Sequence, residues 1–321
     1  MLKRLLASLD QTLRERIFTG AVLGPAIVGV VLLDGLAPLL GLPLLALVFA
    51  VASCGAEEFA KMLRSKRAES EAAAPQAKPV GNPVKAEQAG KKWQQPRYMG
   101  AFMGGLPVLF LYFVGRDYQD WVLLVLTMVI VFNVLMAALG LIADVAKRTW
   151  RALVDFAIVA VASAYIGGLM TLLLFLRRLG DGAKPPWACW PVLLLFALTW
   201  AVDISAYFGG RAFGRRPLWP RVSPRKTVEG AAIGLVAAIG VVLFAFAIGL
   251  HREMTPFAAM LTALVVGVAA QAGDFVESAA KRWLGVKDSG AVLPGHGGVL
   301  DRFDSLLLGA PALWICLLVL V

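Results

Sequence analysis

Charged residues are scarce in this sequence: Asp, Glu, Lys and Arg make up 16% of the 321 residues, whereas hydrophobic residues make up 59%. With a mean hydropathy of +0.75, the composition lies outside the usual range of soluble domains. Apolar runs of about 17 to 22 residues recur along the chain, the length that a helix needs to cross a bilayer. The sequence therefore predicts an all-α, polytopic integral membrane helical bundle.

Several chemistries lack the motifs that they need. The three cysteines, Cys54, Cys189 and Cys316, lie in or beside apolar segments without metal-ligand spacing, which indicates packing residues. Neither an HExxH pattern nor a GxSxG turn occurs, which argues against zinc hydrolysis and acyl transfer. A GxxxxGKS/T loop is also missing, so the chain is not a P-loop enzyme.

About nine membrane spans are predicted from the apolar runs. They cover residues 17–33, 35–54, 99–115, 121–142, 152–176, 188–208, 230–250, 257–276 and 305–321. Pro38 and Pro43 make the second span irregular, so eight or ten spans would also fit. We group the spans into an N-terminal region (17–61), a middle region (98–187) and a C-terminal region that holds the candidate catalytic residues (188–321).

Two segments outside these spans have distinct compositions. Residues 1–16 carry leucines along one helical stripe and basic residues mostly elsewhere, which predicts a helix lying on the membrane surface. Residues 62–97 are rich in Ala, Pro, Lys, Glu and Gln. Because this segment lacks the apolar content to fold alone, we predict a flexible cytoplasmic linker.

The basic residues indicate the orientation in the membrane. The N-terminus and the alternate loops on its side of the membrane carry 26 of the 31 Lys and Arg residues. The positive-inside rule then places the N-terminus in the cytoplasm and the C-terminus outside. Since the net charge of +10 is spread over many short loops, it fits this topology better than binding to nucleic acid.

The stretch from Gly273 to Asp304 is the most polar part of the chain. Its charged residues and histidine are Asp274, Glu277, Lys281, Arg282, Lys287, Asp288, His296, Asp301, Arg302 and Asp304. A carboxylate near the end of a membrane span, such as Asp274, usually signals function because its insertion is costly. Asp301 and Asp304 open the last helix on one face, where two carboxylates can share a divalent cation.

Structural roles remain open for some of these residues. Asp301 and Asp304 also suit capping of a helix start, and Asp274 also suits an ion pair with Lys281. His296 fits a hydrogen-bonding loop residue as well as a phosphate contact.

A second polar cluster runs from Asp203 to Gly230, and the predicted topology places it on the same side of the membrane. Asp203 and Tyr207 are one helical turn apart and share a face. Six basic residues follow them: Arg211, Arg215, Arg216, Arg221, Arg225 and Lys226. They could neutralise phosphate oxygens or mark topology. A topology signal, however, would not need the Ser, Thr and Glu of the SPRKTVEG run at Ser223–Gly230.

Together the two clusters supply carboxylates, cations and a glycine-rich loop. This is the set of groups needed for phosphoryl or nucleotidyl transfer with Mg²⁺. The alternative is a transporter for a phosphorylated or anionic solute. Transport would place polar groups near the midplane and on both sides of the membrane, whereas here they lie mainly on one side.

Most of the polar stretch, from Ser278 to Asp304, resembles a known signature. Over about 27 residues, the spacing of the following positions is similar to that of the phosphatidate cytidylyltransferase family, also called CDP-diacylglycerol synthases: Ser278, Lys281, Arg282, Lys287, Asp288, Gly290, Pro294, His296, Gly297, Gly298, Asp301, Arg302 and Asp304. Asp203, Ala206, Tyr207, Gly210 and the SPRKTVEG run look like a second characteristic region. The resemblance covers roughly the last 120 residues, with small departures at Ala280 and Arg225.

The resemblance implies transfer of CMP from CTP to phosphatidic acid, giving CDP-diacylglycerol and pyrophosphate. It implies Mg²⁺ as cofactor, with a second cation left open, and a polytopic membrane protein that is often a homodimer. It further implies a bacterial cytoplasmic membrane, with membrane lipid as partner and the site facing the cytoplasm.

Roles carried over by position fall into three groups. The metal ligands would be Asp274, Asp301 and Asp304, with Asp203 and Asp288 as second choices. The substrate-binding residues would be Asp203, Tyr207, Ser223, Arg225, Lys226, Thr227 and Ser278. The remaining catalytic residues would be Lys281, Arg282, Lys287, Asp288, His296 and Arg302.

This assignment predicts that Asp301→Asn abolishes Mg²⁺-dependent formation of a CDP-lipid, because a metal ligand is lost, while the protein still inserts into the membrane. The measurement is product formation from labelled CTP by membranes that contain matched amounts of each protein. Near-normal turnover would remove Asp301 from the metal site.

Overall fold

The computed structural model describes residues 11–36, 42–72, 100–101, 103–105, 108–109, 151–180, 187–290, 292 and 297–321. Its long helices are α2 (Gln11–Leu36), α3 (Leu42–Ala72), α7 (Arg151–Leu179), α8 (Trp190–Phe213), α9 (Val228–Ile248), α10 (Pro256–Leu284) and α11 (Leu300–Leu320). Short 3₁₀ turns lie at Trp187–Cys189 and Leu250–Arg252. Strands β1 (Pro217–Trp219) and β2 (Ser223–Thr227) form one antiparallel hairpin.

The prediction of an all-α polytopic membrane protein is confirmed. Within the described residues, six helices are long and apolar enough to cross a membrane: Leu42–Ser70, Val154–Leu179, Trp190–Phe213, Val228–Ile248, Pro256–Leu284 and Leu300–Leu320. A shorter apolar helix covers Thr19–Asp34. The predicted count of nine is not confirmed, because the span at 121–142 and most of the span at 99–115 lie outside the described residues.

Two predicted boundaries near the N-terminus differ from the structure. Helix α2 runs without a break from Gln11 through the predicted end of the surface helix at residue 16. Helix α3 continues to Ala72, so residues 62–72 are helical rather than the start of the linker. Within this segment the side chains of Met62 and Leu63 are buried, which stabilises the helix beyond its predicted end. The rest of both segments, 1–10 and 73–97, lies outside the described residues.

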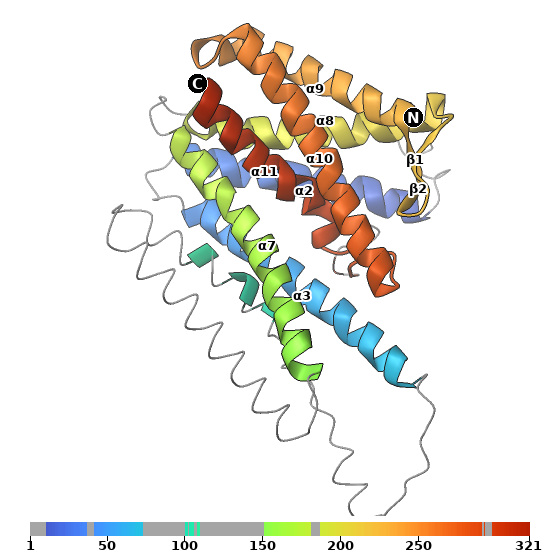
Figure 1. Cartoon of the computed structure of the whole chain (residues 1–321). Coiled ribbons are helices and arrows are strands. Elements are labelled where there is room, and N and C mark those ends of the chain that lie inside the picture. Colours follow the sequence, from blue (N-terminus) through green and yellow to red (C-terminus); the bar gives the residue numbers. More distant parts are fainter. Residues whose placement is uncertain are drawn as a thin grey trace, which may run out of the picture.

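The helices pack into one bundle (Figure 1). Helices α8, α9 and α10 lie side by side, and α11 lies between α10 and α7. Helix α3 crosses α7 and also contacts α11. The hairpin lies at one end of the bundle and the C-terminus at the other. Polar groups carried by the hairpin and the adjacent helix ends therefore meet at one end of the molecule.

Small residues set how closely the C-terminal helices approach. A Cβ atom on Gly230 would lie 2.6 Å from the backbone oxygen of Ala206, and one on Gly273 would lie 2.5 Å from that of Asp304. Close backbone contact through small residues is a common way to pack helices in membranes. Gly273 thus allows α10 to contact α11 directly beside Asp274, which brings the acidic residues of both helices together.

Ion pairs join the N-terminal helices to the rest. Arg177 Nε on α7 lies 2.8 Å from Asp34 Oδ2 on α2, and the Asp34 side chain is fully buried. Arg67 on α3 lies 2.8 Å from Asp155 on α7. The buried Arg177–Asp34 pair fixes the relative positions of α7 and α2, because a displaced Arg177 would leave the buried Asp34 charge unpaired.

Gly273→Ala is expected to lower the free energy of unfolding of the purified protein by about 1–3 kcal/mol, the usual cost of overpacking a tight contact. The matched control is Gly240→Ala on α9, where a Cβ atom would meet nothing within 4 Å. This control should be neutral or slightly stabilising, because alanine favours helices. Melting temperatures in detergent test the difference; equal values for the two variants would contradict the role of Gly273.

Candidate active site

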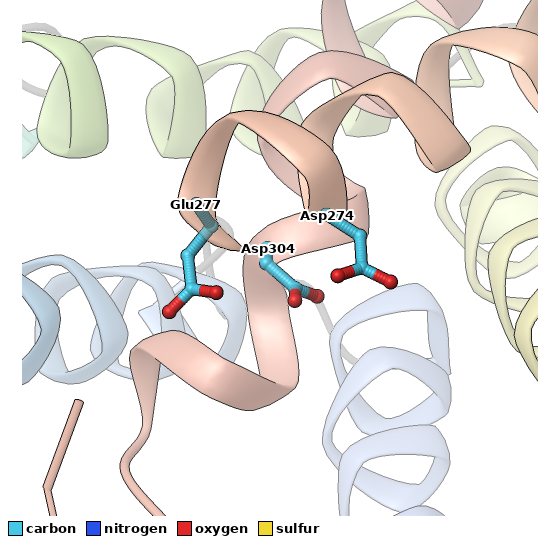
Figure 2. Close-up of side chains that lie close together, drawn as sticks. All are labelled: Asp274, Glu277 and Asp304. Carbon is cyan, nitrogen blue, oxygen red and sulfur yellow. The ribbon is translucent and has the colours of Figure 1, made fainter. Parts of the chain in front are cut away.

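Three carboxylates gather where α10 contacts α11. Asp274 and Glu277 are three residues apart on α10 and share one face, and Asp304 of α11 lies between them (Figure 2). One carboxylate oxygen from each residue can be chosen so that all three lie within 4.8 Å of one another. Oxygen ligands at this spacing suit a hard divalent cation such as Mg²⁺.

Two lysines lie against this three-carboxylate cluster. Lys226 of β2 forms an ion pair with Asp274. Lys281 Nζ lies 2.5 Å from Glu277 Oε2 and 2.5 Å from Asp301 Oδ1. These cations offset part of the repulsion between the clustered acids, which is strong away from water.

Asp203 of α8 completes the acidic surroundings of the cluster. Its Oδ2 atom accepts a hydrogen bond of 2.9 Å from Ser305 Oγ, next to Asp304 in α11. Ser278 Oγ lies 3.4 Å from Asp274 Oδ1 on the other side. Of these two predicted substrate-binding residues, Ser278 contacts a carboxylate of the cluster directly, and Asp203 is linked to α11 through Ser305, the neighbour of Asp304.

A pocket of about 590 Å³ opens beside the cluster, between α8, the hairpin, α9 and α10. The predicted site residues that line it are Asp203, Tyr207, Ser223, Arg225, Lys226, Thr227 and Asp274. Arg211 and Gln271 also line it. The volume is typical of a small-molecule site. Two sequence regions predicted to form one site are thus joined by Asp274, which belongs to both the pocket and the cluster.

Residues of the SPRKTVEG run also build the hairpin. Thr227 is the N-cap of α9, and its Oγ1 atom accepts a hydrogen bond of 3.1 Å from the Gly230 amide. Glu229 Oε2 accepts from the backbone amides of Arg215 and Arg216 at 3.0 and 3.2 Å. Such contacts hold the end of β2, and with it Lys226, next to Asp274.

Asp301 lies outside the three-carboxylate cluster. Besides Lys281, its carboxylate accepts hydrogen bonds from the amides of Ser289 and Gly298 at 2.9 and 2.8 Å and from Ser289 Oγ at 3.0 Å. Its predicted metal role stays a prediction. Asp301 also holds the loop between α10 and α11 through Ser289 and Gly298, so a displacement of this loop in Asp301→Asn would lower activity as well.

The other predicted catalytic residues lie around this loop. Lys287, Asp288 and Arg302 are exposed. Arg282 is exposed too, and its Nε donates to the Val222 backbone oxygen in the hairpin turn at 3.3 Å. His296 lies outside the described residues.

Sequence reasoning missed two acidic residues of the site. Glu277 was named among the charged residues of the polar stretch but not among the metal ligands, although its position three residues after Asp274 places both carboxylates on one helix face. Glu58 was not singled out at all. It is 3% exposed and accepts hydrogen bonds from the amides of Val299 and Leu300. The cost of burying a carboxylate in an apolar segment was the available signal.

The family model described as the cytidylyltransferase family matches residues 14–320. The chain belongs to the cytidylyltransferase family. The resemblance found in the signature residues is therefore confirmed, and the family match extends through the N-terminal half.

Curated relatives agree with this family. The chain is 40% identical over 159 residues to the phosphatidate cytidylyltransferase of Bacillus subtilis, covering 50% of this chain and 57% of the relative. It is 43% identical over 155 residues to the one of Brucella abortus, covering 48% and 55%. For Staphylococcus epidermidis the values are 38% over 165 residues, covering 51% and 60%. The chain thus spans little more than half the length of these relatives.

Thr227→Val should lower the free energy of unfolding by about 1 kcal/mol, because the side chain that caps the start of α9 is lost. Thr227→Ser keeps the hydroxyl and should melt close to the wild type. Melting is measured without nucleotide, so that substrate binding does not contribute. If the valine and serine variants melt together, the cap does not stabilise the hairpin junction.

Proposed function

We propose that this protein transfers CMP from CTP to phosphatidic acid, giving CDP-diacylglycerol and pyrophosphate. The observation that carries the proposal is the juxtaposition of the three-carboxylate cluster with the pocket lined by Arg225 and Lys226. Relatives named phosphatidate cytidylyltransferase support the choice of substrates. Carboxylates for a metal and cations for phosphate are the groups that this reaction requires.

Mg²⁺ fits the donor set of the cluster. All three groups are carboxylates, and their oxygens can be chosen within 4.8 Å of one another, which matches the preference of Mg²⁺ for hard oxygen ligands. We assign Asp274, Glu277 and Asp304 to this role; Asp203, which hydrogen-bonds to Ser305 beside Asp304, is the candidate ligand for a second cation. When bound, the ion would neutralise and orient phosphate oxygens of the nucleotide.

The residues of the pocket would position two polyanions. Ser223, Arg225 and Lys226 line the same pocket as Asp203 and can bind phosphate oxygens of CTP or of the lipid. Lys226 both lines the pocket and pairs with Asp274, so phosphate bound there lies beside the cluster. Bringing the phosphatidate oxygen in line with the α-phosphorus of CTP is then the main task of the protein.

This reaction does not require a general base in the protein. A phosphate monoester has a second pKa of about 6, so phosphatidic acid is largely dianionic at neutral pH. Its phosphate oxygen forms a bond to the α-phosphorus of CTP, and the bond from that phosphorus to the bridging oxygen breaks. Pyrophosphate leaves with that oxygen, so no proton has to be removed from the attacking group.

Location and assembly are part of the proposal. The distribution of Lys and Arg and the bacterial relatives support a bacterial cytoplasmic membrane with the pocket facing the cytoplasm. CTP is soluble and phosphatidic acid lies in the membrane, so a pocket at the end of the bundle suits both. A homodimer and the lack of a nucleic-acid partner remain predictions.

Purified protein in mixed micelles with labelled CTP, phosphatidic acid and Mg²⁺ should form a CDP-lipid and an equal amount of pyrophosphate. Asp304→Asn should lower kcat at least about 100-fold, because it removes charge that holds the metal. Asp155→Asn is the matched control, since Asp155 pairs with Arg67 away from the pocket; it should retain most of the activity. The absence of a CDP-lipid product from folded wild-type protein would contradict the function and favour transport of an anionic solute.

A further inference from the structure

Glu58 connects helix α3 to the loop between α10 and α11. It lies on α3, and its side chain is 3% exposed. Its carboxylate accepts hydrogen bonds from the Val299 amide (2.8 Å), the Leu300 amide (2.9 Å) and Ser289 Oγ (2.9 Å). All three partners are more than 230 positions away in the sequence. One buried carboxylate thus binds both ends of the loop between α10 and α11.

The two backbone contacts cap helix α11. The first amides of a helix have no partner within the helix, and Val299, the N-cap residue, makes no side-chain cap bond. Glu58 supplies the missing acceptor from another helix, and its negative charge lies at the favourable end of the helix dipole. The same first turns carry Asp301 and Asp304, so the cap fixes where these acids lie.

A hydrogen-bonded path leads from Glu58 to the three-carboxylate cluster. Ser289 Oγ lies 2.9 Å from Glu58 Oε2 and 3.0 Å from Asp301 Oδ2. Asp301 in turn contacts Lys281, and Lys281 contacts Glu277. A displacement of Glu58 would therefore move groups that directly surround the proposed metal ligands.

Two signature glycines match the space that Glu58 occupies. A Cβ atom on Gly290 would lie 2.9 Å from Glu58 Oε1, and one on Gly298 would lie 2.7 Å from Glu58 Cδ. Any larger residue at either position would push the carboxylate away from the loop. These glycines are thus required by the close approach of a side chain from α3.

We infer that Glu58 is a positioning residue for the reaction: it sets the start of α11 and, through Ser289, the geometry of Asp301 and Lys281. The inference rests on the proposed function. Glu57, the neighbour of Glu58, is also buried but has different partners. Glu57 lies 2.5 Å from Arg64 and accepts from the Ala101 amide at 3.3 Å, and these partners lie outside the loop.

The test compares Glu58→Gln with Glu57→Gln as the matched control. Groups that orient metal ligands typically contribute about 10- to 100-fold to activity or metal affinity. Glu58→Gln should therefore lower kcat by about 10- to 100-fold, raise the Mg²⁺ concentration for half-maximal rate, and leave the KM for CTP little changed. Hydrogen exchange should become faster in peptides covering 289–303 and stay unchanged in α9. Glu57→Gln should keep near-wild-type values of kcat, Mg²⁺ dependence, KM for CTP and hydrogen exchange.

Wild-type kcat, Mg²⁺ dependence and hydrogen exchange in Glu58→Gln would overturn the inference. If Glu58→Gln does not fold, Ser289→Ala provides the test, because it removes the hydroxyl between Glu58 and Asp301 but keeps the contacts of Glu58 with the Val299 and Leu300 amides. A lowered kcat with a raised Mg²⁺ requirement in Ser289→Ala would support the inference. Wild-type values of both would overturn it. If the wild type itself makes no CDP-lipid, the proposed function fails. Hydrogen exchange and Mn²⁺ binding by the Glu58→Gln protein then still test the positioning role.

Discussion

Repulsion among three carboxylates at the contact of α10 with α11 is the constraint on which the rest of the site depends. Asp274, Glu277 and Asp304 offer oxygens within 4.8 Å of one another, in a protein composed mostly of apolar residues. Such an arrangement is stable only if cations compensate it. Lys226 and Lys281 do so from opposite sides, and a bound divalent ion would add the remaining compensation.

The other parts of the bundle can be understood from this requirement. Gly273 lets the two helices approach. The hairpin, held by Thr227 and Glu229, delivers Lys226. The loop between α10 and α11 orients Lys281 through Asp301, and α3 supports that loop from the N-terminal half of the chain. In the proposed reaction, the C-terminal helices would therefore carry the metal and phosphate ligands, and the N-terminal helix α3 would fix their geometry.

Much of this could be predicted from the sequence. Long apolar runs predicted each helix from 151 onward, although several helices extend past the predicted ends, most clearly at the end of α10, which runs to Leu284 instead of residue 276. The clustering of Asp203, Lys226 and Asp274 followed from two polar segments on one side of the membrane. The family resemblance found in the last 120 residues proved correct. Local patterns were sufficient for these features because each involves residues close in sequence or segments with an unusual composition.

Other features depend on contacts between distant segments and left no local pattern. The role of Glu58 requires knowing that α3 contacts the start of α11, 241 positions away. Asp301 and Asp304 share a helix face, yet only Asp304 joins the cluster, because Lys281, Ser289 and Gly298 hold the Asp301 carboxylate. The composition of 62–97 suggested a linker, but residues 62–72 are helical because Met62 and Leu63 are buried and Arg67 pairs with Asp155 of α7.

The proposed reaction depends on Asp274, Glu277 and Asp304 together holding a divalent cation. The most direct measurement is Mn²⁺ binding to the purified protein, followed by electron paramagnetic resonance in the absence of nucleotide. We expect saturable binding to the wild type, displaced by Mg²⁺ and lost in Glu277→Gln, which changes the one proposed ligand that the family signature did not assign. Unchanged Mn²⁺ affinity in Glu277→Gln would contradict this expectation.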